Sequence, residues 1–203
     1  MATKKTLWPV TTVAIVLGML VLPVFPQDEP PPTTGDTSEI SDAIAELMKR
    51  AEQGDASAQD NLGSMYYNGR GVSQDYKEAL RWYRAAAEQG DATAQFNMGV
   101  IYYNGQGVPQ DYKEAIRWYR AAAEQGDASA QYGLGFMYYN GQGVPQDYIQ
   151  AHMWYNLAAS DLTGDDREVA VKNRDSLAEN MTSEQIAEAQ RLAREWKPKT
   201  GSQ

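Results

Sequence analysis

The sequence contains no cysteine, a single histidine and no excess of basic residues. Without cysteine the chain has no disulfide bond, no thiol nucleophile and no thiolate metal site. Its 203 residues carry 27 acidic and 18 basic side chains, a formal charge of −9, whereas a nucleic-acid-binding protein is expected to present a basic face. No Ser-His-Asp order and no cluster of metal ligands accompanies His152. The sequence therefore indicates no catalytic, cofactor-binding or metal-binding residue and no nucleic-acid partner.

Charge is absent between Lys5 and Asp28, and residues 7–25 are almost entirely apolar. Residues 1–26 are therefore predicted to be a signal peptide or a single-pass membrane anchor, since nineteen apolar residues just span a bilayer core of about 30 Å. A small-x-small cleavage site is missing, which favours the anchor. Lysines before the segment and acids after it predict that the repeats lie outside the cytoplasm. Residues 27–40, with three consecutive prolines, are predicted to be an extended linker.

One segment recurs with a fixed period. The tetrapeptide AEQG ends at residues 54, 90 and 126, and the copies at 55–90 and 91–126 differ at 8 of 36 positions. A third copy occupies 127–162 and diverges after Gln150. A period of this size predicts a solenoid, in which each unit buries its apolar face only against its neighbours.

Each copy is predicted to form two helices, A and B. In the second copy, helix A runs from Ala92 to Asn104 after an Asp91 N-cap, and helix B runs from about 112 to 125. Asp111 and Glu114 have the spacing of a capping box. Glycine in the middle of helix A, as at Gly99, costs about 1 kcal/mol against alanine and indicates close approach of another helix. Three tryptophans, one in each helix B, are predicted to fill the space between helices: Trp82, Trp118 and Trp154.

The ends of the array are predicted to be capped. Residues 41–54 resemble a lone helix B, N-capped by Ser38 or Ser41, with a stripe formed by Ile44, Leu47 and Met48. In the third helix B, Ile149 and Met153 replace charged residues, with Leu157 one turn on. Residues 163–197 are predicted to cover them as a helix pair, at 165–180 and 183–196, with a Thr182–Gln185 capping box. Residues 198–203 form a tail.

Variation between copies concentrates on helix A. The largest changes turn Asp60 and Ser64 into Phe96 and Val100, and then into Tyr132 and Phe136. These positions are four residues apart and share a face, with a tyrosine at its edge in every copy. We predict that this face lines a concave, partner-binding groove formed by Asp60, Ser64, Tyr67, Phe96, Val100, Tyr103, Tyr132, Phe136 and Tyr139. The alternative, which the sequence leaves open, is that the aromatic side chains pack between copies.

The pattern AxAQxxLGxxYYNGxGVxQDYxxAxxWYxxAA resembles the Sel-one-like repeat (SLR), a relative of the tetratricopeptide repeat, over roughly residues 42–196. The resemblance implies an all-α, right-handed α/α superhelix that binds other proteins and is not an enzyme. Bacterial members of similar layout are envelope or host-interaction scaffolds. The resemblance thus implies an adaptor for a protein or peptide in the bacterial cell envelope, without a cofactor.

This adaptor is expected at the inner membrane, facing the periplasm through residues 7–25 if they are uncleaved, or otherwise periplasmic or secreted. A structural or regulatory subunit of an envelope complex is the alternative, and the missing nucleophile argues against a cell-wall hydrolase. His152 occupies the position of Leu80 and Ile116 on helix B, which favours a packed side chain over a ligand. The sequence indicates no particular oligomeric state.

Overall fold

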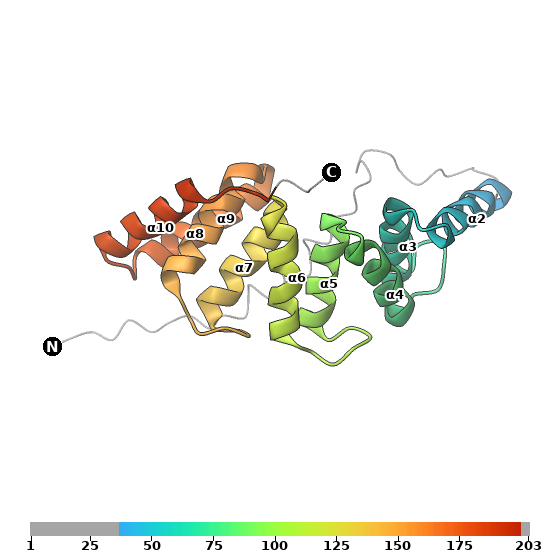
Figure 1. Ribbon diagram of the computed structural model, residues 1–203, viewed down its shortest axis with the longest axis horizontal. Helices are drawn as coiled ribbons and strands as arrows, with labels where there is room; N and C mark the ends of the chain where they lie inside the picture. The colour runs from blue at the N-terminus through green and yellow to red at the C-terminus, as the bar shows by residue number, and fades with distance from the viewer. Residues whose placement is uncertain (1–36, 200–203) are drawn as a thin grey trace.

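The computed structural model describes residues 37–199, with side chains from residue 42 onward. Within this range the chain forms helices and no strand, and consecutive helices pack side by side along the long axis (Figure 1). The expected all-α solenoid is confirmed. The elements are α2 (Thr37–Glu52), α3 (Ala56–Asn68), α4 (Tyr76–Glu88), α5 (Ala92–Asn104), α6 (Tyr112–Glu124), α7 (Ala128–Asn140), α8 (Tyr148–Asp161), α9 (Gly164–Ala178) and α10 (Ser183–Glu195).

Each A helix begins and ends with the same chemistry. The carboxylates of Asp55, Asp91 and Asp127 accept a hydrogen bond from the amide three residues on, at 2.7–3.0 Å, which stabilises the start of each helix. Each A helix ends at a glycine in the left-handed region, such as Gly105 with φ 71°. Because the caps recur every 36 residues, the three A helices have identical lengths.

The predicted capping box at Asp111 forms only in part. The Asp111 carboxylate accepts from the amides of Lys113 and Glu114. The Glu114 side chain pairs with Arg117 on the next turn, at 3.0 Å, instead of bonding back to the N-cap. The box at Thr182 and Gln185 is complete, with both reciprocal hydrogen bonds present.

Helix hairpins close on a glycine–tyrosine contact. A Cβ atom added to Gly63, Gly99 or Gly135 would lie 2.4–2.7 Å from the ring of a buried tyrosine on the following B helix. No real side chain tolerates that distance, so the mid-helix glycines allow the close approach expected from the sequence. The tyrosines in these contacts are Tyr83, Tyr119 and Tyr155.

The three B-helix tryptophans, Trp82, Trp118 and Trp154, lie in the core between helices, each 6–7% exposed. In the first two copies an arginine guanidinium covers the ring: Arg81 lies 4.0 Å from the centroid of Trp82, and Arg117 lies 4.1 Å from that of Trp118. In the third copy Met153 stands in the arginine's place and is buried. Trp154 there meets Trp196, with ring centroids 6.0 Å apart. The C-terminal cap thus supplies an aromatic cover.

The two ends of the array differ from expectation in detail. α2 begins at Thr37, so Ser38 and Ser41 lie inside the helix and the last residues of the predicted linker belong to it. The apolar spacing of Ile40, Ile44 and Leu47 already extended one turn before the predicted start. Residues 1–36 and 200–203 lie outside the described residues. They include the predicted signal peptide or anchor, most of the linker and most of the tail.

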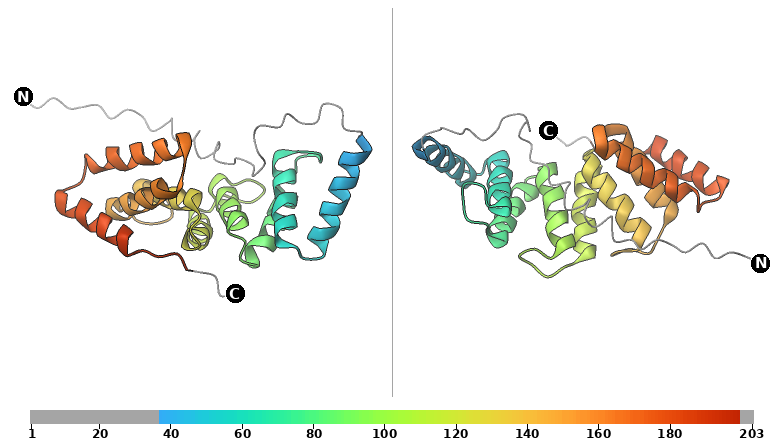
Figure 2. Two further views of the ribbon diagram at one scale, coloured as in Figure 1. Left: turned by 90° about the horizontal axis from the view of Figure 1, so that it is seen from above. Right: turned by 180° about the vertical axis from the view of Figure 1, so that it is seen from behind.

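The C-terminal helices cover α8 as predicted, from two sides. α9 and α10 each pack against α8 and barely contact one another, diverging from their connecting turn (Figure 2). Met153 is buried beneath them, while Ile149 and Leu157 are half-buried. After α10 the chain turns back to the middle of the array, where the Lys199 amide donates to the Glu124 carbonyl and its Nζ lies 2.7 Å from the Glu124 carboxylate.

Candidate functional site

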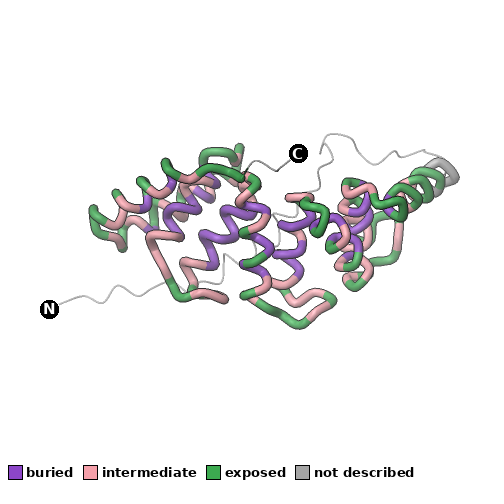
Figure 3. Tube along the Cα trace, in the orientation of Figure 1, coloured by how far each residue is buried: buried purple, intermediate pink, exposed green. Residues whose placement is uncertain are grey.

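The nine predicted groove residues divide by burial. Phe96, Val100, Tyr132 and Phe136 are core side chains, 1–8% exposed. Tyr132 meets Tyr155, with ring centroids 5.4 Å apart. The remaining five are half-buried: Asp60, Ser64, Tyr67, Tyr103 and Tyr139. A partner approaching this face would therefore meet the half-buried five, while the other four hold the helices together. Figure 3 shows buried stretches through the middle of the array and exposed ones mainly at its loops and two ends.

The buried aromatic side chains contact neighbouring helices. The ring centroids of Phe96 on α5 and Tyr119 on α6 are 5.7 Å apart. Those of Phe136 on α7 and Tyr103 on α5 are 6.1 Å apart. Burial raises the pKa of Tyr132 to about 12, and its hydroxyl accepts a hydrogen bond from Asn173 on α9 at 2.7 Å. These contacts correspond to the packing alternative that the sequence left open.

The half-buried tyrosines form a row with partners that the sequence analysis did not single out. The last turn of each A helix carries one of them: Tyr67, Tyr103 or Tyr139. Its ring packs on the tyrosine that begins the following B helix, with ring centroids 5.3, 5.4 and 5.8 Å apart in the three copies. We call these six residues the tyrosine row: Tyr67, Tyr76, Tyr103, Tyr112, Tyr139 and Tyr148. The repeated QDY tripeptide carried the missing half of the signal, because its tyrosine follows the N-cap in every copy.

Hydrogen bonds fix the tyrosine row to its loops. Gln74, Gln110 and Gln146 each donate to the carbonyl oxygen of the A-helix tyrosine, at 2.6–2.8 Å. The Tyr67 hydroxyl donates to Gln106 in the next copy's loop at 2.6 Å. The loops that follow α5 and α7 emerge at the same edge of the molecule (Figure 1). The row is therefore held in place at each loop, and its first two copies are linked directly.

Asp60 is the polar member of the face. Its carboxylate accepts from Asn97 Nδ2 at 3.0 Å, a bond that joins α3 to α5. Burial, reinforced by the charge of Asp91 and opposed by the hydrogen bond from Asn97, raises the pKa of Asp60 to about 6. A carboxylate of this kind is close to its titration range near neutral pH.

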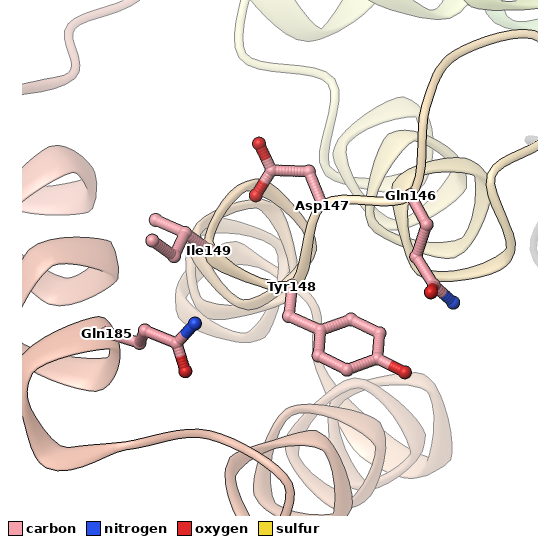
Figure 4. A pocket seen from close by; sticks show the side chains of 5 residues that line it. All are labelled: Gln146, Asp147, Tyr148, Ile149 and Gln185. Atoms are coloured by element: carbon pink, nitrogen blue, oxygen red, sulfur yellow. The ribbon is translucent and has the colours of Figure 1, made fainter.

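A cleft of about 280 Å³ lies where the first turn of α8 faces α10. Figure 4 shows Gln185 reaching from α10 toward Tyr148 and Ile149, with Gln146 and Asp147 on the α8 side. Ile149, expected to be fully covered, instead forms the apolar wall of this cleft. None of its lining residues forms an ion pair with another described residue, so it resembles an incompletely packed cap more than a reactive site.

His152 is packed, as the sequence favoured. The side chain is 3% exposed, and burial lowers its pKa, with the nearby Arg174 charge acting in the same direction. Within residues 37–199, no group of three or more His, Asp or Glu side chains is arranged to hold a metal ion. Over the same residues no helix has the length and hydropathy needed to span a bilayer. The predicted membrane segment lies outside this range.

Comparison with known proteins follows the repeat boundaries. The Sel1 repeat model matches residues 56–91, 92–127 and 128–161, together just over half of the chain. The crystal structure of c5321, a protective antigen of uropathogenic Escherichia coli that displays an SLR fold, is similar at 40% identity with a TM-score of 0.69. The match covers 75% of this chain but only 32% of that longer one.

A Sel1 repeat protein from Oxalobacter formigenes is also 40% identical, with a TM-score of 0.58, over 66% of this chain and 98% of that one. No curated protein matches the chain.

Proposed function

The chain belongs to the Sel1 repeat family, and from that premise we propose that it is an adaptor of the bacterial cell envelope that holds a protein or peptide against the tyrosine row. Proteins built from these repeats generally mediate protein–protein contacts and are typically not catalytic. The observation that carries the proposed face is the tyrosine row itself. Its six half-buried rings recur every 36 residues, as a pair of tyrosines in contact at the end of each A helix and the start of each B helix.

Tyrosine suits a protein interface for physical reasons. It buries a large ring with few rotatable bonds and keeps a hydroxyl for hydrogen bonding. Burial raises the pKa of Tyr67 and of Tyr103, so both hydroxyls stay neutral at physiological pH. An extended peptide along the edge would meet equivalent rings in successive copies. We therefore expect the partner to contact at least two repeats at once.

An envelope location is supported from two directions. The charge-free residues 7–25 have the composition of a signal peptide or an anchor, and the similar c5321 is a protective antigen. If the segment is uncleaved, the repeats would face the periplasm from the inner membrane. If it is cleaved, they would be periplasmic or secreted.

Site-specific crosslinking in cells tests the face. A photoreactive residue at Tyr103 or Tyr139 is expected to capture the same partner, whereas one at the exposed Glu88, at the other end of helix B, is not. With the photoreactive residue at Tyr103, the captured band should disappear when Tyr67 and Tyr139 are both changed to leucine, with the melting temperature monitored in parallel. Adducts from Glu88 with none from Tyr103 would place the contact away from the tyrosine row and contradict the proposal.

A further inference from the structure

α9 is a fourth A helix by its hydrogen bonding. In the first two copies Gln59 and Gln95 donate to the carbonyl oxygens of Ala51 and Ala87, at 3.0 and 3.1 Å. At the same period Arg167 donates through Nε to the carbonyl oxygen of Ala159, also at 3.1 Å. α9 therefore docks on α8 as α3 and α5 dock on the helices before them, whereas Gln131 on α7 does not form this bond.

α10 does not complete this fourth hairpin. The glycine–tyrosine contact that closes the other three falls, 36 residues beyond Gly135 and Tyr155, on Val171 and Arg191. A side chain at this position would clash with a ring placed as in the other hairpins, and Arg191 pairs instead with Glu188 and Glu195 on its own helix. α10 accordingly lies on α8, with Trp196 against Trp154 (Figure 2).

The displaced helix leaves a groove between α8 and α9. It measures about 370 Å³ and is lined by Asn156, Ala159, Ser160, Arg167, Val171 and Arg174. In complete repeats the corresponding surface is covered by the next B helix, as Tyr155 covers Gly135. The groove therefore follows from the loss of the fourth hairpin.

The groove differs from the first two repeats in which hydrogen-bonding groups it offers at the equivalent position. The side-chain oxygens of Gln59 and Gln95 accept hydrogen bonds from Gln89 and Gln125 at 2.7 and 2.8 Å, so each glutamine both donates and accepts. Arg167 can only donate. Among the described residues its Nη atoms have no hydrogen-bond or ion-pair partner. The groove thus presents donors where the repeats present an acceptor.

The lining also carries a net positive charge within an acidic chain. Arg174 donates to Asn156 Oδ1 at 3.1 Å and pairs with the Asp175 carboxylate at 2.7 Å. Arg174 is therefore paired, whereas Arg167, which follows Asp165 and Asp166 in the first turn of α9, forms no ion pair among the described residues. Asn156 Nδ2 remains available as a further donor. One guanidinium fork with one spare amide suits a single carboxylate better than a doubly charged phosphate.

We propose that the α8–α9 groove binds the side-chain carboxylate of an acidic peptide segment, held bidentately by the Nη atoms of Arg167. Val171 and Ala159 form an apolar floor on which the carbon stem of a glutamate packs. The site is separate from the tyrosine row and goes beyond the proposed function. The C-terminal end of the array would thus bind an acidic segment, a different kind of ligand from that of the tyrosine row.

The test uses fluorescence anisotropy at low ionic strength, with the full chain and a labelled Gly-Ser peptide that carries two glutamates. Binding is expected to weaken at least about fivefold for the glutamine version of the peptide and for Arg167→Gln. This variant restores the residue of the other repeats, and in two of those three repeats the glutamine forms the backbone bond that Arg167 forms here. An unchanged melting temperature is therefore expected. Arg194→Gln removes an equal charge from the exposed end of α10 and should bind as the wild type does.

Equal binding by Arg167→Gln and wild type would overturn the proposal, as would an equal loss in Arg194→Gln, which would mean unspecific attraction. Tighter binding of a phosphoserine version of the peptide would overturn the choice of carboxylate. Crosslinking from Tyr103 should be unaffected by Arg167→Gln, so the outcomes for this groove and for the tyrosine row can be told apart.

Discussion

The contacts between consecutive A helices change character along the array. Between α3 and α5 the link is polar, from Asn97 to Asp60. Between α5 and α7 it is apolar, with Phe96 on the ring of Tyr119 and Gly133 close enough that an added Cβ would lie 3.3 Å from the same ring. Correspondingly, α3 has four buried residues, α5 seven and α7 eight. Near-identical copies can therefore contribute very different stability, and we infer that the array is weakest at its N-terminal side.

The largest effect should come from Tyr119, the ring shared by both sides of the apolar junction. Tyr119→Ala is expected to lower the free energy of unfolding by about 3–5 kcal/mol, because it empties a fully buried site that touches Phe96, Gly99 and Gly133. Denaturant unfolding followed by circular dichroism measures it.

Tyr119→Phe is the matched control. The buried hydroxyl has no hydrogen-bond partner among the described residues, so its removal should leave stability equal to or above that of the wild type. A Phe variant as unstable as the Ala variant would show that the hydroxyl, not the ring, stabilises the junction.

A smaller loss is expected when the apolar junction is made to resemble the polar one. Phe96→Ser should cost about 3 kcal/mol, because it removes a ring from the core and leaves a hydroxyl there. Ser64→Ala, on the same face but half-buried, should change stability by less than about 0.5 kcal/mol. If Phe96→Ser left the melting temperature unchanged and abolished partner capture, the ring would belong to a groove and the distinction between the junctions would fail.

The smallest predicted effect is a gain in stability when Asp60, at the polar junction between α3 and α5, is changed. The folded pKa of Asp60, about 6, lies above its unfolded value, so the cost of its buried charge is fully present above pH 6. That cost is relieved as pH falls from about 6 to 4, because only the folded state takes up the proton in this window. Asp60→Asn should therefore stabilise the protein by about 1–2 kcal/mol at pH 7, after allowance for partial exposure, and by little near pH 4.

Thermal melts of Asp60→Asn and wild type across this pH range measure the gain. Asp55→Asn provides a contrast of opposite sign. A hydrogen bond from Ala58 lowers the Asp55 pKa, so its stabilising effect is lost as pH falls. A gain from Asp60→Asn that did not depend on pH would rule out the buried charge as its cause.

Local sequence patterns were sufficient to predict most of the fold. The bounds of α5 were predicted to the residue, because Asp91 and Gly105 fix its ends by short-range hydrogen bonds. The glycine in mid-helix was explained by a close approach, although the sequence did not identify the tyrosine ring involved. The pair of C-terminal helices was predicted because Ile149, Met153 and Leu157 put apolar side chains on a face of helix B that is largely exposed in the other copies. The divergence of α9 from α10 was missed, although Val171 and Arg191 at the repeat period carried the signal.

The candidate face was only partly predictable. A single helix shows which residues share a side, but whether that side is open depends on how closely neighbouring A helices approach. Phe96 and Phe136 face α6 and α5, contacts set by the packing of whole hairpins. Tyr67, Tyr103 and Tyr139 were found because they recur. Their partners on the B helices were passed over, since a residue present in every copy resembles a structural one.

The unfinished fourth hairpin sets the direction in which this protein can grow. A copy spliced in after Gly90 would find a ready-made docking surface on each side, because the units there share caps, glycines and tyrosines. A copy appended after residue 195 would find neither, since α10 occupies the flank of α8 and Val171 closes the next interface. Gene duplication, or a designer lengthening the array, would therefore have to insert new copies between existing ones.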